Sequence, residues 1–104
     1  MTQPGRARFP DSPKGSVSWA YYSDDGATLV IEFFDYGDEA ASSMGGDVAY
    51  LLHLDAESQR LFSEKLGEPA RPETLIQRFG NYGDVKRYLN EHAIPYRHEF
   101  DSQA

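Results

Sequence analysis

Apolar and polar residues alternate along two neighbouring segments, residues 16–23 and residues 28–35. A period of two residues is typical of a β-strand with one buried face. Asp25 and Gly26 lie between the segments, and an Asp-Gly pair readily adopts the positive φ angles of a tight hairpin turn. The pattern therefore predicts a β-hairpin. Its larger apolar side chains are expected to form the core face: Val17, Trp19, Tyr21, Leu29, Ile31 and Phe33.

Residues 47–54 continue with a third alternating segment, which predicts a strand with His53 on the side away from the core. A helix is expected next, over residues 55–66. Asp55 is a suitable N-cap, since its carboxylate can accept a hydrogen bond from an amide of the first turn. Gly67 is suited to the left-handed conformation that ends many helices.

The C-terminal third has helical spacing followed by a short alternating stretch. Pro72 suits the first turn of a helix, and residues 80–83 interrupt the helical pattern. Asp84 is then the predicted cap of a further helix, which must end near Ala93 because Pro95 disfavours helical geometry in the preceding residue. Residues 96–100 alternate again and predict a final strand.

The resulting element order is βββααβ, with the helical part in one piece or split into two or three. Strands followed by helices predict an α+β fold, in which an antiparallel sheet of three to four strands carries helices on one face. Residues 16–101 are expected to form this single domain. Residues 1–15, with three prolines, predict a disordered N-terminal tail, and residues 102–104 a disordered end.

Charge and composition narrow the class of partner. The chain has 104 residues, no cysteine and a net charge of −7. Residues 16–70 hold eleven acidic and two basic residues, which is −9, whereas residues 71–104 hold five of each. Such a field disfavours nucleic acid and anionic membranes. The absence of cysteine and of a long apolar run predicts a soluble cytoplasmic protein without disulfides or a membrane span.

The seven tyrosines, together with Trp19, Phe34 and Phe100, exceed what a small core requires. Tyr22 and Phe34 are predicted on the strand face opposite the core, and exposed aromatic residues beside acidic ones are typical of protein-binding surfaces. The simpler alternative is that helices, the tail or a second copy cover both faces of the sheet. Five residues are the predicted contact surface: Tyr22, Phe34, Tyr36, Asp38 and Glu39.

These features predict a non-catalytic protein-binding module, such as an inhibitor, an immunity-type factor or an adaptor. Its partner would be a protein with a basic surface or a second copy of the chain. Tyr82 is expected in a loop. The basic residues of the C-terminal third are expected to lie on a solvated, salt-bridged face: Arg78, Lys86, Arg87 and Arg97.

The alternative is a small metal-dependent or acid/base hydrolase that uses His92, His98 and Glu99. Histidine and carboxylate side chains can bind zinc or transfer protons. However, His92 and His98 are six residues apart and lie on either side of Pro95. Paired ligands usually follow a spacing of four on a helix or two on a strand. The sequence therefore predicts no metal, no cofactor and no assigned catalytic residue.

Overall fold

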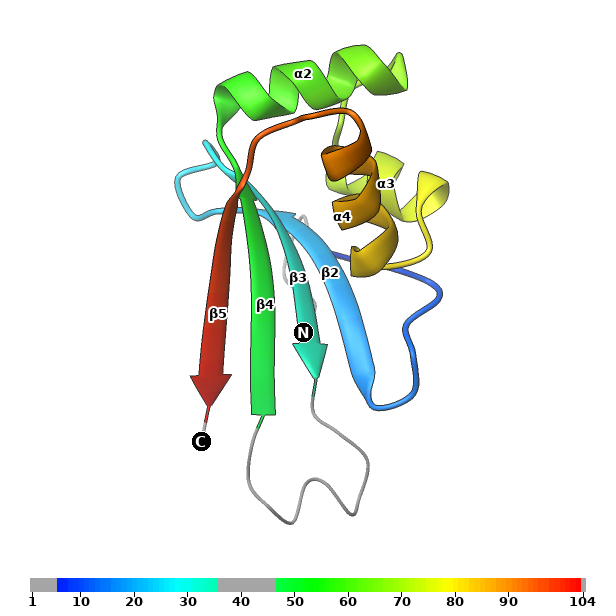
Figure 1. The fold of residues 1–104 in the computed structure, drawn as a ribbon, viewed down its shortest axis with the longest axis vertical. Coiled ribbons are helices and arrows are strands. Elements are labelled where there is room, and N and C mark those ends of the chain that lie inside the picture. The colour runs from blue at the N-terminus through cyan, green and yellow to red at the C-terminus, as the bar shows by residue number, and fades with distance from the viewer. Residues whose placement is uncertain (1–5, 36–46, 104) are drawn as a thin grey trace.

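The structure, a computed structural model, describes residues 6–35 and 47–103. Within these residues the centre of the fold is a five-stranded antiparallel sheet, whose strands follow one another in space as they do in sequence (Figure 1). The strands are β1 (Ala7–Arg8), β2 (Ser16–Tyr22), β3 (Leu29–Asp35), β4 (Asp47–Leu54) and β5 (Arg97–Gln103). The predicted α+β class is confirmed, and the sheet has five strands where three to four were expected.

Three helices of the described chain are inserted between β4 and β5 and pack against one face of the sheet (Figure 1). They are α2 (Ala56–Leu66), α3 (Pro72–Arg78) and α4 (Tyr82–Glu91). We call the sheet face toward these helices the inner face and the opposite one the outer face. The longest of them has eleven residues, whereas a bilayer requires about 20 apolar residues in a helix. Accordingly, none of the described helices could cross a membrane.

The pairing of β2 with β3 corrects the predicted core face of the hairpin. Ala20 pairs with Ile31 and Ser18 with Phe33, and directly opposed residues point to the same side of a sheet. Ala20 and Ser18 are therefore on the inner face, while Trp19 is on the outer face. The prediction that Val17, Trp19 and Tyr21 face the core is wrong. The prediction placed the larger side chains of β2 in the core. In the structure the small residues face the core, because they leave room for other side chains to pack above them.

Phe9 is one of those groups, and it corrects the predicted N-terminal tail. Its side chain is 1% exposed and belongs to the core cluster that includes Ala20. The Phe9 amide donates to the carbonyl of Ser18 (3.0 Å), and β1 pairs with β2 just before it. Residues 6–15 are thus part of the domain, which the low apolar content of this segment did not suggest. Residues 1–5 lie outside the described residues.

The helix ends follow the predicted chemistry at two of three positions. Asp55 accepts a hydrogen bond from the Ser58 amide (2.9 Å), and Gly67 is left-handed at the end of α2, as predicted. At α4 the cap is Asn81 rather than Asp84. Its side-chain oxygen accepts from the Asp84 amide (3.0 Å), so the helix begins at Tyr82. At the chain end, β5 extends through residues 102 and 103, which had been assigned to a disordered end.

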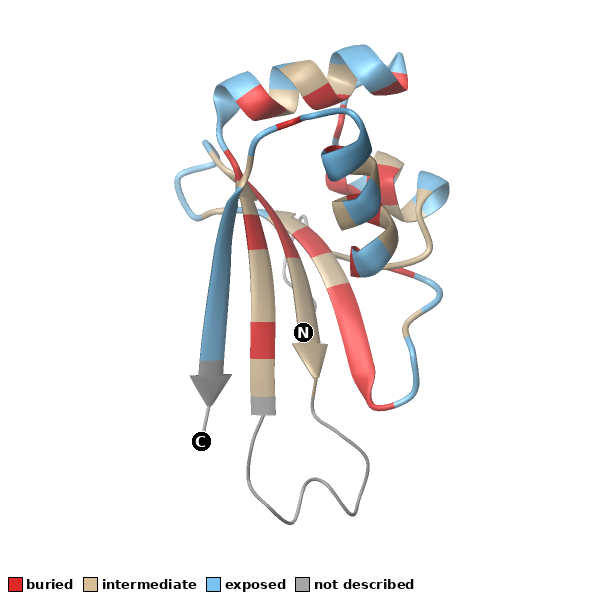
Figure 2. Cartoon of the chain, viewed as in Figure 1, coloured by how far each residue is buried: buried red, intermediate tan, exposed pale blue. Residues whose placement is uncertain are grey.

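Burial divides the inner face into two rows of directly opposed residues. The covered row consists of Ala20, Ile31 and Leu52, each 0% exposed. The aromatic row lies two residues further along the strands and consists of Phe33, Tyr50 and Phe100. Phe33 and Tyr50 are half-buried, and Phe100 on the edge strand is 53% exposed. Figure 2 shows this change along β3, from buried residues near the helices to partly exposed ones below.

Candidate functional site

Two of the five residues of the predicted contact surface are described, and they lie on opposite faces of the sheet. Tyr22 pairs with Leu29 and is therefore on the inner face, where it is 38% exposed. Phe34 pairs with Val17 and with Ala49 and lies on the outer face. Tyr36, Asp38 and Glu39 lie outside the described residues. The two described members therefore could not contact one partner surface together.

The residues of the alternative acid/base site are also separated. His98 and Glu99 are neighbours in β5, so their side chains point to opposite faces. The His98 ring is 6.1 Å from that of Tyr50 on the inner face, whereas Glu99 meets His53 Nε2 (2.7 Å) on the outer face. His92 is at the end of α4, with its ring 4.2 Å from that of Tyr88. No cluster of three metal-ligating side chains occurs among the described residues.

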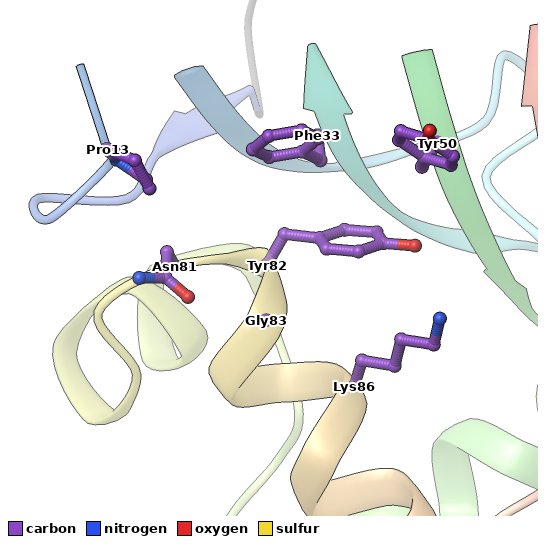
Figure 3. Close-up of a pocket in the computed structure, with 7 residues that line it drawn as sticks. All are labelled: Pro13, Phe33, Tyr50, Asn81, Tyr82, Gly83 and Lys86. Carbon is purple, nitrogen blue, oxygen red and sulfur yellow. The ribbon is translucent and has the colours of Figure 1, made fainter. Parts of the chain in front are cut away.

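A pocket of about 340 Å³ lies where the aromatic row passes the beginning of α4 (Figure 3). We call it the aromatic pocket. The sheet contributes Phe33 and Tyr50, and the segment before β2 contributes a proline. The start of α4 and its cap supply the remaining wall. The lining residues are Pro13, Phe33, Tyr50, Asn81, Tyr82, Gly83 and Lys86.

Hydrogen bonds hold the beginning of α4 against the sheet and so define this pocket. The buried hydroxyl of Ser18 on β2 accepts from the amide of Tyr82 (3.2 Å). The side-chain amide of Asn81 donates to the carbonyl of Asp11 (3.0 Å). Since Asn81 also caps the helix, the first turn of α4 is bonded to β2 and to the segment that precedes it. The pocket is therefore formed by secondary structure rather than by a loop alone.

Aromatic rings form the walls of the pocket. The Phe33 ring centroid is 6.0 Å from that of Tyr50 and 5.7 Å from that of Tyr82. Both pairs are tilted and lie within the range of favourable ring contacts. Tyr50 also contacts Phe100, at 5.1 Å between centroids, so the wall continues toward the edge strand. Such a surface suits a flat apolar group.

Tyr82 supplies a polar group to the side chains that line the pocket. Its side chain is 8% exposed, and no described residue pairs with its hydroxyl, whose oxygen is shielded from solvent. A buried polar group without a partner costs about 1–3 kcal/mol. Burial, followed by the nearby Tyr96 and Tyr50, raises the pKa of Tyr82 to about 12. The hydroxyl is therefore protonated at neutral pH and can donate a hydrogen bond.

Lys86 is the second polar group of the pocket. It is four residues after Tyr82, a spacing that places both side chains on one face of α4. Figure 3 shows the Lys86 ammonium and the Tyr82 hydroxyl directed toward the same end of the pocket, below the Tyr50 ring. The ion pairs found among the described residues involve other cations, and none includes Lys86. An apolar cavity with two convergent polar groups is the usual form of a ligand site.

A second hollow, of about 390 Å³, is lined by more charged residues, most of which have partners. Asp55 caps α2 through the Ser58 amide, and His53 is bonded to Glu99. Glu57 is paired with Arg60, and the Tyr96 hydroxyl donates to Asn90. These groups hold the fold together, so this hollow has less to offer a ligand than the aromatic pocket.

Neither Tyr82 nor Lys86 was among the predicted site residues. Tyr82 was expected in a loop because Gly80 and Gly83 interrupt the helical pattern, and Lys86 was expected on a salt-bridged face. Their spacing of four was the available signal, but it becomes informative only once the helix is known to begin at Tyr82. The facing residues Phe33 and Tyr50 come from strands far away in sequence. Comparisons with models of protein families, with curated proteins and with solved structures yielded no match for this chain.

Proposed function

We propose that this chain is a non-catalytic binding module whose site is the aromatic pocket, and that its ligand carries an aromatic ring. The observation that carries the proposal is the Tyr82 hydroxyl, which is buried, lacks a protein partner among the described residues and belongs to a side chain that lines this pocket. A ligand that accepts a hydrogen bond there would recover the cost of leaving the group unpaired. The rings of Phe33 and Tyr50, which are neighbours on the sheet, would contact one side of the ligand ring.

A binding role fits the chemistry of the pocket better than a catalytic one. A general base works best when its pKa is near the operating pH. The pKa of Tyr82 is moved the other way, to about 12. Among the described lining residues there is no carboxylate, histidine, serine or threonine that could act as base or nucleophile. The pocket offers shape, ring contacts and hydrogen-bond donors.

Titration with 3-phenylpropanamide, a neutral molecule with one ring and one hydrogen-bond acceptor, tests this function. We expect amide resonances of residues 33, 50 and 81–86 to shift together in heteronuclear NMR spectra. Tyr50→Ala, which removes one wall, should abolish the shifts. Tyr22→Ala is the matched control, since Tyr22 is an exposed aromatic residue of the inner face outside the pocket. Shifts that are absent, or that survive Tyr50→Ala, would contradict the proposal.

The protein partner with a basic surface remains a prediction from the sequence. The acidic residues of this chain that were predicted to contact it, Asp38 and Glu39, lie outside the described residues, and so does Tyr36. Tyr22 and Phe34 would have to act on separate faces. The aromatic pocket needs none of these residues, so the two ideas can be tested independently.

A further inference from the structure

We infer that the ligand of the aromatic pocket is a small aromatic carboxylic acid, whose ring lies against Phe33 and Tyr50 and whose carboxylate is bound by Lys86 and Tyr82. This inference rests on the proposed function and makes it more specific. It adds a negative charge to the ligand and assigns a recognition role to two residues of α4. It also limits the ligand to a small molecule.

The need for a negative charge comes from the polar end of the pocket. Lys86 is a cation that lines an otherwise apolar cavity, and none of the ion pairs found in the described residues includes it. A carboxylate would complement this charge, whereas an amide or alcohol would leave it uncompensated. Hydrogen bonds that involve a charged group are also roughly twice as strong as those between neutral groups.

Tyr82 explains why the acceptor should be a carboxylate rather than a halide or another featureless anion. A carboxylate has two oxygens and can accept from the Tyr82 hydroxyl and the Lys86 ammonium simultaneously. The two donors belong to one helix face and are directed to the same end of the pocket (Figure 3). The flexible stem of Lys86 allows its ammonium to follow the ligand, while Tyr82 is fixed by the hydrogen bond from its amide to Ser18.

The size of the pocket and the charge of the chain indicate what kind of acid could bind. Small-molecule sites have volumes of about 300–1,000 Å³, and this pocket, at about 340 Å³, is near the lower limit. A one-ring or two-ring acid fits that volume. The net charge of −7 would repel an anion at long range, but screening at physiological salt limits this repulsion to roughly 8 Å. Contacts within the pocket therefore decide affinity.

The test compares 3-phenylpropanoate with 3-phenylpropanamide, which differ only in the charged group, by calorimetric titration of the whole chain. We expect the acid to bind at least about tenfold more tightly than the amide, the factor that corresponds to about 1.4 kcal/mol. Lys86→Gln should remove this preference, because it should lower the affinity for the acid far more than the affinity for the amide. Lys65→Gln, at an exposed lysine in the last turn of α2, is the matched control and should change neither affinity. Tyr82→Phe should weaken the binding of both probes.

Three outcomes would overturn the inference. Equal affinity for acid and amide would mean that charge is not recognised, and would leave the proposed function standing. An acid preference that survives Lys86→Gln would exclude the assigned cation. A peptide ending in phenylalanine that binds far more tightly than 3-phenylpropanoate, and loses this advantage on C-terminal amidation, would identify a polypeptide terminus as the ligand instead. Failure of both small probes to bind would contradict the proposed function itself.

Discussion

The covered row and the aromatic row belong to the same strands and the same face of one sheet, yet they differ in what lies above them. Ile31 and Leu52 in the covered row are fully buried. Phe33 and Tyr50, two residues away on the same two strands, are half-buried and line a pocket. The helices make this difference. They lie over the end of the sheet where β3 begins and β4 ends, and the beginning of α4 borders the aromatic row (Figure 1).

On this face of the sheet, the type of side chain depends on whether a helix covers it. Beneath the helices the row consists of aliphatic residues, which pack densely and have no polar atom to satisfy. Where the cover ends, the residues are aromatic, and a ring can remain partly exposed while it contacts its neighbours. The hydroxyl of Tyr82 is located at this border. A buried donor without a partner lowers stability, so its presence there is better explained by binding than by folding.

The largest expected difference between the rows is in stability. Leu52→Ala should lower the free energy of unfolding by about 2–5 kcal/mol, because a fully buried leucine leaves a cavity. Tyr50→Ala, on the same strand and face, should cost less because its ring is already partly exposed. Urea denaturation followed by circular dichroism measures both. Equal losses would show that the aromatic row is part of the core and is not a surface reserved for a ligand.

The sequence was sufficient to predict the elements of this fold but not how they face one another. Alternation located β2, β3 and β4 within one residue, and the Asp55 cap and the Gly67 stop of α2 were both confirmed. The face of β2 was assigned wrongly because Trp19 is the largest residue there. Which face of β2 points to the core depends on the register with β3 and on the burial of Phe9. Phe9 belongs to a segment rich in proline and polar residues. These are contacts between distant parts of the chain.

The site was beyond prediction for a related physical reason. A pocket is a property of surfaces that meet, and here Tyr50 on β4 meets Tyr82 on α4, 32 residues later. The exposed aromatic residues were expected on the side opposite the core, as for Phe34. The structure adds a second possibility, in which the core face itself extends beyond its helical cover. Phe33 was correctly assigned to the core face, and yet it lines the site.

Tyr82, at the border between the two rows, should make the stability of the fold depend on pH. The pKa of Tyr82 is raised from 10.0 to about 12 in the folded chain, so folding favours the protonated hydroxyl. The stabilisation is therefore fully present below pH 10 and is lost as the pH rises from about 10 to about 12. Burial also raises the pKa of Tyr21 on the outer face, so Tyr21 contributes to the same alkaline loss of stability. Chemical denaturation at several alkaline pH values measures the effect.

A pair of variants separates these two tyrosines. Tyr82→Phe should flatten the alkaline loss of stability, and at neutral pH it should leave stability unchanged or slightly higher because the unpaired hydroxyl is gone. Tyr21→Phe is the comparison at the outer face. It removes a hydroxyl that donates to Glu32 (2.6 Å) and should reduce stability at neutral pH. A marked loss of stability in Tyr82→Phe would mean that its hydroxyl has a partner within the protein, which would weaken the argument for a ligand.

The smallest expected effect is at the exposed end of the aromatic row. Phe100→Ser removes one ring contact, with Tyr50, and such a pair contributes about 0.5–1.5 kcal/mol. Because Phe100 is 53% exposed, less apolar burial is lost than at a fully buried position of the same face. Phe100 does not line the aromatic pocket, so the affinity for 3-phenylpropanamide should stay within about twofold, a change of roughly 0.4 kcal/mol. A larger loss of affinity would show that the binding surface continues along the whole row to the edge strand β5, and that the natural ligand is longer than one ring.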